Sequence, residues 1–291
     1  MLVSVNDMLK DAKKNRYAIP AFDVSNYEMI RCAVEVCAEM RSPALLMAII
    51  PDLEGNGLGF ISSMVKHAAG IYNIPVCLHL DHATDFGDIK KAIESGFTSV
   101  MYDGSVLPFE QNAANTREVV SYAHQRGISV EAELGHVSDA ILGSGEAFVA
   151  RNDDDTESNL TKVSEVEQFV TSTGVDCLAV AIGTAHGVYI KTPVLRFDRL
   201  EKINAVCQTP LVLHGGSGTP DKDLQKAISL GITKINIYSD LLNALNTGLK
   251  DKLNSLENMS SWPLVVFKDA IAKMKEVIRN KIITFGSENR V

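Results

Sequence analysis

Cysteine is scarce in this chain of 291 residues. The cysteines are odd in number, lie far apart and form no Cys-x-x-Cys pair, a pattern that argues against a disulfide framework or a thiolate metal site. They are Cys32, Cys37, Cys77, Cys177 and Cys207. Because most of them fall inside apolar segments, we expect reduced core residues in a cytoplasmic protein.

Positive charge and long apolar runs are also missing. Lysine and arginine number 28 against 36 aspartates and glutamates, the net charge is -8, and no run of five basic residues occurs. A nucleic-acid partner is therefore not expected. No stretch of 18 apolar residues exists, and residues 1–7 have neither a basic nor an apolar signal region. We expect no membrane segment and no secretion signal.

Short apolar, β-prone segments recur along the chain, with amphipathic stretches between them. Hydrophobic residues make up 46% of the sequence, enough for a large core, and the length suits one domain over residues 1–291. The predicted strands are residues 17–22, 44–48, 76–80, 99–102, 129–133, 177–182, 211–214 and 234–237. Eight strand-then-helix units spaced about 30 residues apart predict a (β/α)8 TIM barrel, an α/β fold.

Two segments exceed what such a barrel needs. The connection from Leu134 to Thr161 is long and contains several glycines and an acidic run. It follows the fifth predicted strand, so we interpret it as a lid over the catalytic face, with a functionless surface insertion as the alternative. Helical patterns over residues 240–256 and 262–285 contain more helix than one unit requires. We predict that the surplus is an extra C-terminal helix that serves oligomerisation or caps the barrel.

Polar residues stand at the ends of the predicted strands, where the active sites of TIM barrels lie. They are Asp23, Asp81, His82, Asp103, Glu131, Glu133, His186, His214 and Asn236. His82, His186 and His214 would converge on the barrel axis and bind one Zn²⁺ with an open fourth position. Taken singly, each histidine is also compatible with a core or loop role. Asp103 and Glu133 are candidates for a second cation, for orienting the histidines, or for structural anchoring.

Glycine-rich turns follow two of these histidines. Gly187 comes after His186, and a Gly-Gly-Ser-Gly segment that begins at Gly215 comes after His214. Such turns offer backbone N–H groups without side-chain bulk. With Ser217, Asn236 and Ser239 they predict a phosphate site next to the last two strands.

At these motifs the sequence resembles a known family, the class II, zinc-dependent ketose-bisphosphate aldolases, and most closely the tagatose-bisphosphate branch. The resemblance runs in order from Ala18 to Gly286. The motifs that carry it are His79-Leu80-Asp81-His82, Glu131-Ala132-Glu133-Leu134-Gly135, Ala179-Val180-Ala181-Ile182-Gly183-Thr184-Ala185-His186-Gly187, Leu211-Val212-Leu213-His214-Gly215-Gly216-Ser217-Gly218 and Lys234-Ile235-Asn236-Ile237.

The resemblance implies a reaction and a role for each motif. The enzyme would cleave a phosphorylated ketose reversibly to dihydroxyacetone phosphate and an aldehyde, with zinc stabilising the enediolate. The three histidines would be the zinc ligands, and Asp81 would transfer the proton of the C4 hydroxyl. A lid carboxylate, Glu146 or Asp139, would act as a second proton-transfer residue. The phosphate would be held by Gly187, Gly215, Ser217, Asn236 and Ser239. The family also implies a monovalent cation, Na⁺ or K⁺, and a homodimer or homotetramer.

The sequence departs from the family pattern mainly where the aldehyde half would bind. Asp23 replaces a common asparagine, Ile49 lies near a usual serine, and Tyr238 stands where an aspartate or a small residue is usual. Ile190 takes the place of a frequent phosphate-binding lysine. We therefore expect a ketose 1-phosphate with another polar or anionic tail, such as a carboxylate or sulfonate, bound by Arg151 or by a neighbouring subunit. The alternatives are an ordinary glycolytic fructose-bisphosphate aldolase and a non-catalytic barrel subunit of an aldolase complex.

Overall fold

Eight parallel strands pair in chain order and close into a barrel, because β1 also pairs with β8. The computed structural model describes residues 1–138, 157–187, 189 and 192–291. The strands are β1 (Ile19–Asp23), β2 (Ala44–Ile49), β3 (Val76–Ala83), β4 (Ser99–Tyr102), β5 (Ser129–Leu134), β6 (Cys177–Val180), β7 (Leu211–Leu213) and β8 (Ile232–Ile237). The predicted TIM barrel is confirmed, with strand ends that differ by a few residues.

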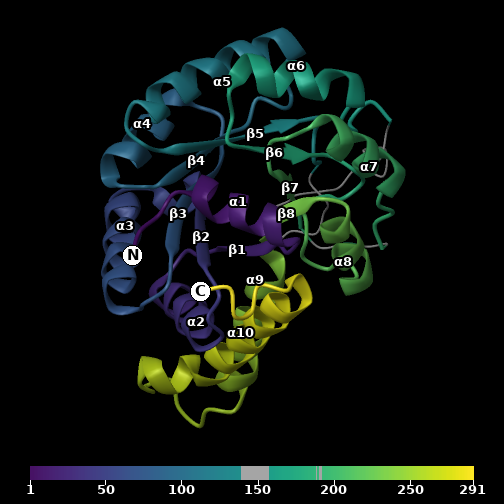
Figure 1. Cartoon of the computed structure of the whole chain (residues 1–291). Coiled ribbons are helices and arrows are strands. Elements are labelled where there is room, and N and C mark those ends of the chain that lie inside the picture. Colours follow the sequence, from purple (N-terminus) through teal and green to yellow (C-terminus); the bar gives the residue numbers. More distant parts are fainter. Residues whose placement is uncertain (139–156, 188, 190–191) are drawn as a thin grey trace.

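Helices form the outer layer around the strands (Figure 1). They are α2 (Tyr27–Glu39), α3 (Gly57–Ile71), α4 (Phe86–Ser95), α5 (Phe109–His124), α6 (Val163–Thr173), α7 (Phe197–Val206), α8 (Asp221–Ser229) and α9 (Ser239–Asn254), with a short 3-10 turn, η1 (Ile50–Leu53), after β2. Local sequence explains several boundaries. The side chains of Asn26 and Asp85 cap the first turns of α2 and α4, and Gly96 ends α4 in the left-handed conformation.

One helix was not anticipated from the sequence. Helix α1 (Val5–Asn15) is capped by Ser4 and buries the apolar residues of one face, among them Met8 and Leu9. This face packs on inward-pointing residues near the beginnings of the strands, such as Ile19 and Leu45. Helix α1 therefore closes the amino-terminal end of the barrel, across which it lies in Figure 1. The spacing of its apolar residues is the signal that could have revealed it.

The extra C-terminal helix is confirmed as α10 (Pro263–Phe285). It packs against α9 and α2 on the flank of the barrel. The contact with α9 is so close that a Cβ atom on Gly248 would lie 2.4 Å from the Cα of Ala270. The capping role that we considered for this helix belongs instead to α1, since α10 lies on the side of the barrel. Its role in oligomerisation stays a prediction.

The long connection after β5 is described only at its two ends. Gly135 adopts a φ of +78°, and the amide of His136 donates to the carbonyl of Asn159 at 2.7 Å. The Thr161 hydroxyl also donates to the carbonyl of Leu134. Both ends are thus anchored beside the carboxyl end of β5. Residues 139–156, including the lid candidates Asp139 and Glu146, lie outside the described residues.

The cysteines are core residues, as expected, because all of them are buried with free thiols. Within the described ranges, no helix has both the length and the apolar character that a bilayer crossing requires.

Candidate active site

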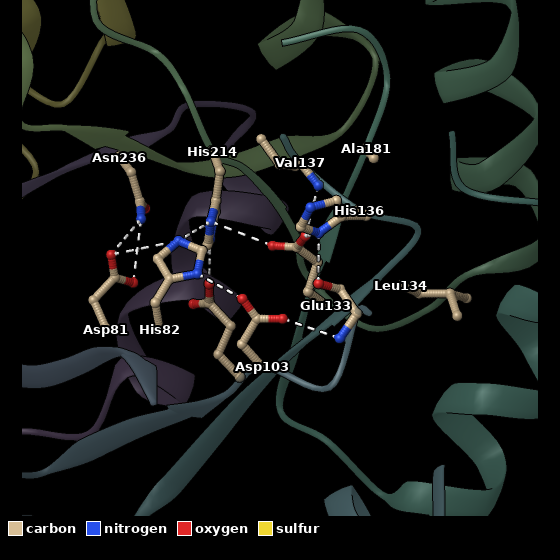
Figure 2. A network of polar contacts seen from close by, with 12 residues as sticks. Asp81, His82, Asp103, Glu133, Leu134, His136, Val137, Ala181, His214 and Asn236 are labelled. Carbon is tan, nitrogen blue, oxygen red and sulfur yellow. Dashed lines mark hydrogen bonds and ion pairs between the residues drawn. The ribbon is translucent and has the colours of Figure 1, made fainter. Parts of the chain in front are cut away.

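Two consecutive side chains at the end of β3 both reach the barrel mouth. In a regular strand, Asp81 and His82 would point to opposite faces. Here the register of β3 with β4 shifts between Leu80 and Ala83, and His82 has a φ of +48°. This irregularity turns both side chains toward the same site, where Figure 2 shows His82 between Asp81 and Asp103. A left-handed conformation is costly for a residue other than glycine, and such conformations cluster at active sites.

The three predicted histidine ligands meet at this mouth. The ring centroid of His82 lies 4.6 Å from those of both His186 and His214, and the latter two are 5.6 Å apart. One nitrogen from each ring can be chosen so that all three lie within 4.8 Å of one another. The Nε2 atom of His82 and the Nδ1 atom of His214 are 2.8 Å apart. Three converging imidazoles fit the donor set of a catalytic zinc site.

Carboxylates behind the histidines fix which nitrogen faces the cluster. Asp103 Oδ2 lies 2.8 Å from Nδ1 of His82, and Glu131 Oε1 lies 2.8 Å from Nε2 of His214. The opposite nitrogens, Nε2 of His82 and Nδ1 of His214, are therefore the ones available for a metal. Asp103 is therefore placed where it could orient His82, one of the roles considered for it. Glu133 accepts from the amide of Val137 at 2.8 Å, while its other oxygen lies 3.6 Å from Nδ1 of His214.

Burial and neighbouring charges shift the pKa values of the site's side chains in different directions. Burial opposes a charge on His82, but the nearby carboxylates, led by Asp81, outweigh it and raise the pKa of His82 to about 10. Burial and the charge of His82 hold the pKa of His214 well below its usual value. Burial and the negative Asp103 raise the pKa of Glu133 to about 8. Because a metal ligand must be a deprotonated imidazole nitrogen, a metal that binds Nε2 of His82 and Nδ1 of His214 displaces any proton held between them.

Asp81 is buried and held by one amide. The Nδ2 group of Asn236 donates to both oxygens of Asp81, at 3.3 and 3.1 Å. Nε2 of His82 lies 3.8 Å from Asp81 Oδ2. The side-chain amide of Asn236, a residue predicted to bind phosphate, contacts the carboxylate predicted to transfer the proton. This placement keeps Asp81 beside the histidine cluster (Figure 2).

The glycine turns and Ser217 lie together beside the start of α9. The hydroxyl of Ser217 accepts from the amides of Tyr238 and Asp240, at 3.1 and 3.2 Å. Helix α9 begins at Ser239, so three of the predicted phosphate residues, Ser217, Asn236 and Ser239, are near one another. Gly215 has a φ of +67°, and a Cβ atom there would lie 2.2 Å from the carbonyl oxygen of Ala185. Only glycine fits this position.

Tyr189 is a linking residue that the sequence did not reveal. Its hydroxyl accepts from the amide of Ala185 at 2.9 Å and lies 2.8 Å from the carbonyl oxygens of Ala185 and Gly215. It therefore joins the segment that precedes His186 to the turn after β7. Ile190 and Lys191, which follow it, lie outside the described residues.

Three of the departures from the family pattern lie at the ends of β1 and β2 and at the start of α9, namely Asp23, Ile49 and Tyr238. Ile49 is the register partner of Asp81. Asp23, at the end of β1, is 3% exposed, and its Oδ1 atom has no hydrogen-bond partner within the described part of the chain. Burial and the charge of Asp81 raise the pKa of Asp23 well above its usual value. Burial and the carboxylates of Asp52 and Asp23 raise the pKa of Tyr238 as well. Asp52, in η1, was not singled out from the sequence.

Comparison with known proteins assigns the chain to a family. The family described as fructose-bisphosphate aldolase class-II matches residues 3–290. The chain belongs to the class II fructose-bisphosphate aldolase family. It is therefore an aldolase, a carbon–carbon lyase, and the family implies a phosphorylated sugar substrate. Class II aldolases are typically metal-dependent, and the histidine cluster is one of three groups of side chains that could hold a metal ion among the residues the structure describes.

Solved structures agree with this assignment. The YdjI aldolase from Escherichia coli K12 is 32% identical, with a TM-score of 0.84 and coverage of 99% of this chain and 98% of that one. A candidate fructose-1,6-biphosphate aldolase from Coccidioides immitis is 28% identical, with a TM-score of 0.83 and coverage of 97% and 96%. The fructose-bisphosphate aldolase from Campylobacter jejuni, 21% identical, shares the fold with a TM-score of 0.81 over 100% and 97% of the two chains.

Proposed function

We propose that this aldolase cleaves a phosphorylated ketose reversibly to dihydroxyacetone phosphate and an aldehyde, with Zn²⁺ held by His82, His186 and His214. The observation that carries the proposal is the meeting of three imidazoles, from the ends of β3 and β7 and from the loop after β6, beside the buried Asp81. When bound, the zinc ion supplies a Lewis acid that stabilises the negative charge developing on the donor half of the substrate.

The residues around the metal have separate tasks in this proposal. Asp81 accepts the proton of the C4 hydroxyl as the bond between C3 and C4 breaks, and the amide of Asn236 orients it for this transfer. Backbone N–H groups at Gly187 and Gly215, with Ser217, Asn236 and Ser239, hold the phosphate of the donor half. Asp103 and Glu131 orient the zinc-binding rings. The second proton-transfer residue is a lid carboxylate, Glu146 or Asp139.

The aldehyde half is bound by the side of the site that carries Asp23, Ile49 and Tyr238. Because these positions depart from the family pattern, fructose 1,6-bisphosphate is proposed to be a poor substrate beside a ketose 1-phosphate with another polar or anionic tail. Among fructose and tagatose enzymes, the proposed kinship is to the tagatose-bisphosphate branch. The enzyme is further proposed to be a single domain over residues 1–291, a cytoplasmic homodimer or homotetramer, and a binder of Na⁺ or K⁺ near the phosphate.

Chelation tests the proposal. Purified enzyme is treated with a chelator and assayed for release of dihydroxyacetone phosphate from a panel of ketose phosphates, before and after Zn²⁺ or Co²⁺ is added back. Activity is expected to disappear with the metal and to return with either ion. Full activity in metal-free enzyme would overturn the proposal.

A further inference from the structure

A buried ion pair crosses the barrel interior beneath the histidine cluster. Lys234 on β8 donates to Glu131 Oε2 on β5 at 2.8 Å, and Glu131 Oε1 lies 2.8 Å from Nε2 of His214. All three side chains are fully buried. Strands β5 and β8 are not neighbours in the sheet, so the pair spans the inside of the barrel. Taking two charges out of water is costly, and a buried ion pair is seldom more stabilising than apolar residues of similar size.

The donors and acceptors in this chain of contacts have a fixed direction. An ammonium group only donates hydrogen bonds, and the carboxylate that receives them only accepts. With Lys234 on one oxygen of Glu131, the other oxygen accepts from an N–H at Nε2 of His214. A neutral imidazole carries one N–H, so Nδ1 of His214 keeps its lone pair. That atom is the one that lies 2.8 Å from Nε2 of His82, in the cluster.

We infer that Lys234 and Glu131 are a positioning pair that fixes the Nε2–H tautomer of His214 and thereby aims the Nδ1 lone pair at the metal. This inference rests on the proposed role of His214 as a ligand. Lys234 does not act on the substrate, because Glu131 and the barrel wall enclose it. The Lys234–Glu131 pair also bears on a second group of side chains with the spacing of a metal site, namely His79, Asp81 and Glu131. In that group, Glu131 Oε2 already accepts a hydrogen bond from the ammonium of Lys234.

Two uncharged double variants separate this role from the cost of a stranded charge. Lys234→Met with Glu131→Gln leaves a carbonyl that accepts from Nε2–H, whereas Lys234→Met with Glu131→Leu leaves no acceptor. Zinc affinity is measured by competition with a chelator, and the tautomer of His214 is read from histidine ¹⁵N shifts in the metal-free protein. The Gln variant is expected to keep the Nε2–H form. The Leu variant is expected to bind zinc ~10–100-fold more weakly, the usual effect of losing such a partner.

A matched control removes a lysine elsewhere. Lys275 pairs with Glu35 at the contact of α10 with α2, and Lys275→Met is expected to leave zinc affinity and tautomer unchanged. Equal zinc affinities and equal tautomers in the two double variants would overturn the inference, and so would loss of the Nε2–H form in both. Failure of the proposed function appears differently, as a full zinc complement in His214→Ala.

Discussion

The two halves of the candidate site differ in how their aspartate side chains are held. On the side of β3, β7 and β8, both carboxylate oxygens of Asp81 accept from the side-chain amide of Asn236. On the side of β1 and β2, the buried Asp23 has one carboxylate oxygen without a hydrogen-bond partner among the residues the structure describes. Asp52 also has one such oxygen. In the proposed function, the first half carries out the bond-breaking chemistry, and the unpaired aspartate oxygens of the second half are available to the aldehyde.

The first half predicts the largest effect. His214→Ala is expected to lower bound zinc and to abolish cleavage, because the other two histidines alone form an incomplete site. Metal analysis of the purified variant, alongside the assay for dihydroxyacetone phosphate, checks this. As a control, His124→Ala, at the end of α5 and paired with Asp176, is expected to leave both unchanged. Full zinc stoichiometry in the His214 variant would remove this residue from the ligand set.

Asp81→Ala is expected to keep its zinc and its fold while losing ~10²–10⁴ of kcat, the usual contribution of a general acid–base group. Because Asp81 adjoins His82, zinc content must be measured with the rate. Asn236→Ala frees the carboxylate without removing it and is expected to cost less. Normal zinc with near-normal turnover in Asp81→Ala would exclude this carboxylate from proton transfer.

Gly215→Ala tests the phosphate turn of the same half. The left-handed conformation at this position costs about 1–2 kcal/mol for a residue with a Cβ atom, before the contact with Ala185 is counted. We expect KM for the ketose phosphate to rise about tenfold or more. Gly127, which also has a positive φ but open space around it, serves as the control for backbone strain alone. Equal KM values in Gly215→Ala and Gly127→Ala would show that the turn is not part of the substrate site.

The second half predicts smaller changes that depend on the aldehyde and on pH. Asp23→Asn is expected to change kcat/KM several-fold for substrates that differ in the aldehyde half. The rate at which dihydroxyacetone phosphate exchanges its donor proton with solvent is expected to stay unchanged.

The raised pKa of Asp23 also has a consequence for the stability of the fold. The folded protein holds this proton above the pKa of the unfolded chain, so stability is lost as pH rises from there through the folded pKa.

The substitution Asp23→Asn removes this loss of stability at higher pH, because an amide side chain does not ionise. The difference in melting temperature between Asp23→Asn and the parent enzyme is the quantity to measure. The variant is expected to gain more over the parent at pH 8 than at pH 4. A difference that is constant with pH would show that Asp23 does not carry this charge cost.

The barrel was predictable because short β-prone segments alternate with amphipathic stretches and because polar residues stand at the predicted strand ends. Helix α1 was missed since it precedes the first strand and belongs to no strand–helix unit. The positive φ of His82 could not be predicted either, because the alternation of a regular strand would place the side chains of Asp81 and His82 on opposite faces. Lys234 could not be interpreted without its partner, since a lysine inside a barrel is unfavourable until Glu131, on a distant strand, is placed beside it. The lid acid stays a prediction.

One measurement compares the two halves directly, namely kcat/KM for fructose and tagatose bisphosphates against ketose 1-phosphates with carboxylate, sulfonate or neutral polar tails. The account predicts that dihydroxyacetone phosphate is the common product and that one of the analogues is cleaved more efficiently than fructose 1,6-bisphosphate. A value for fructose 1,6-bisphosphate at or above ~10⁴ M⁻¹s⁻¹, the lower end of ordinary enzyme efficiency, with no better analogue, would contradict it and make the enzyme an ordinary glycolytic aldolase.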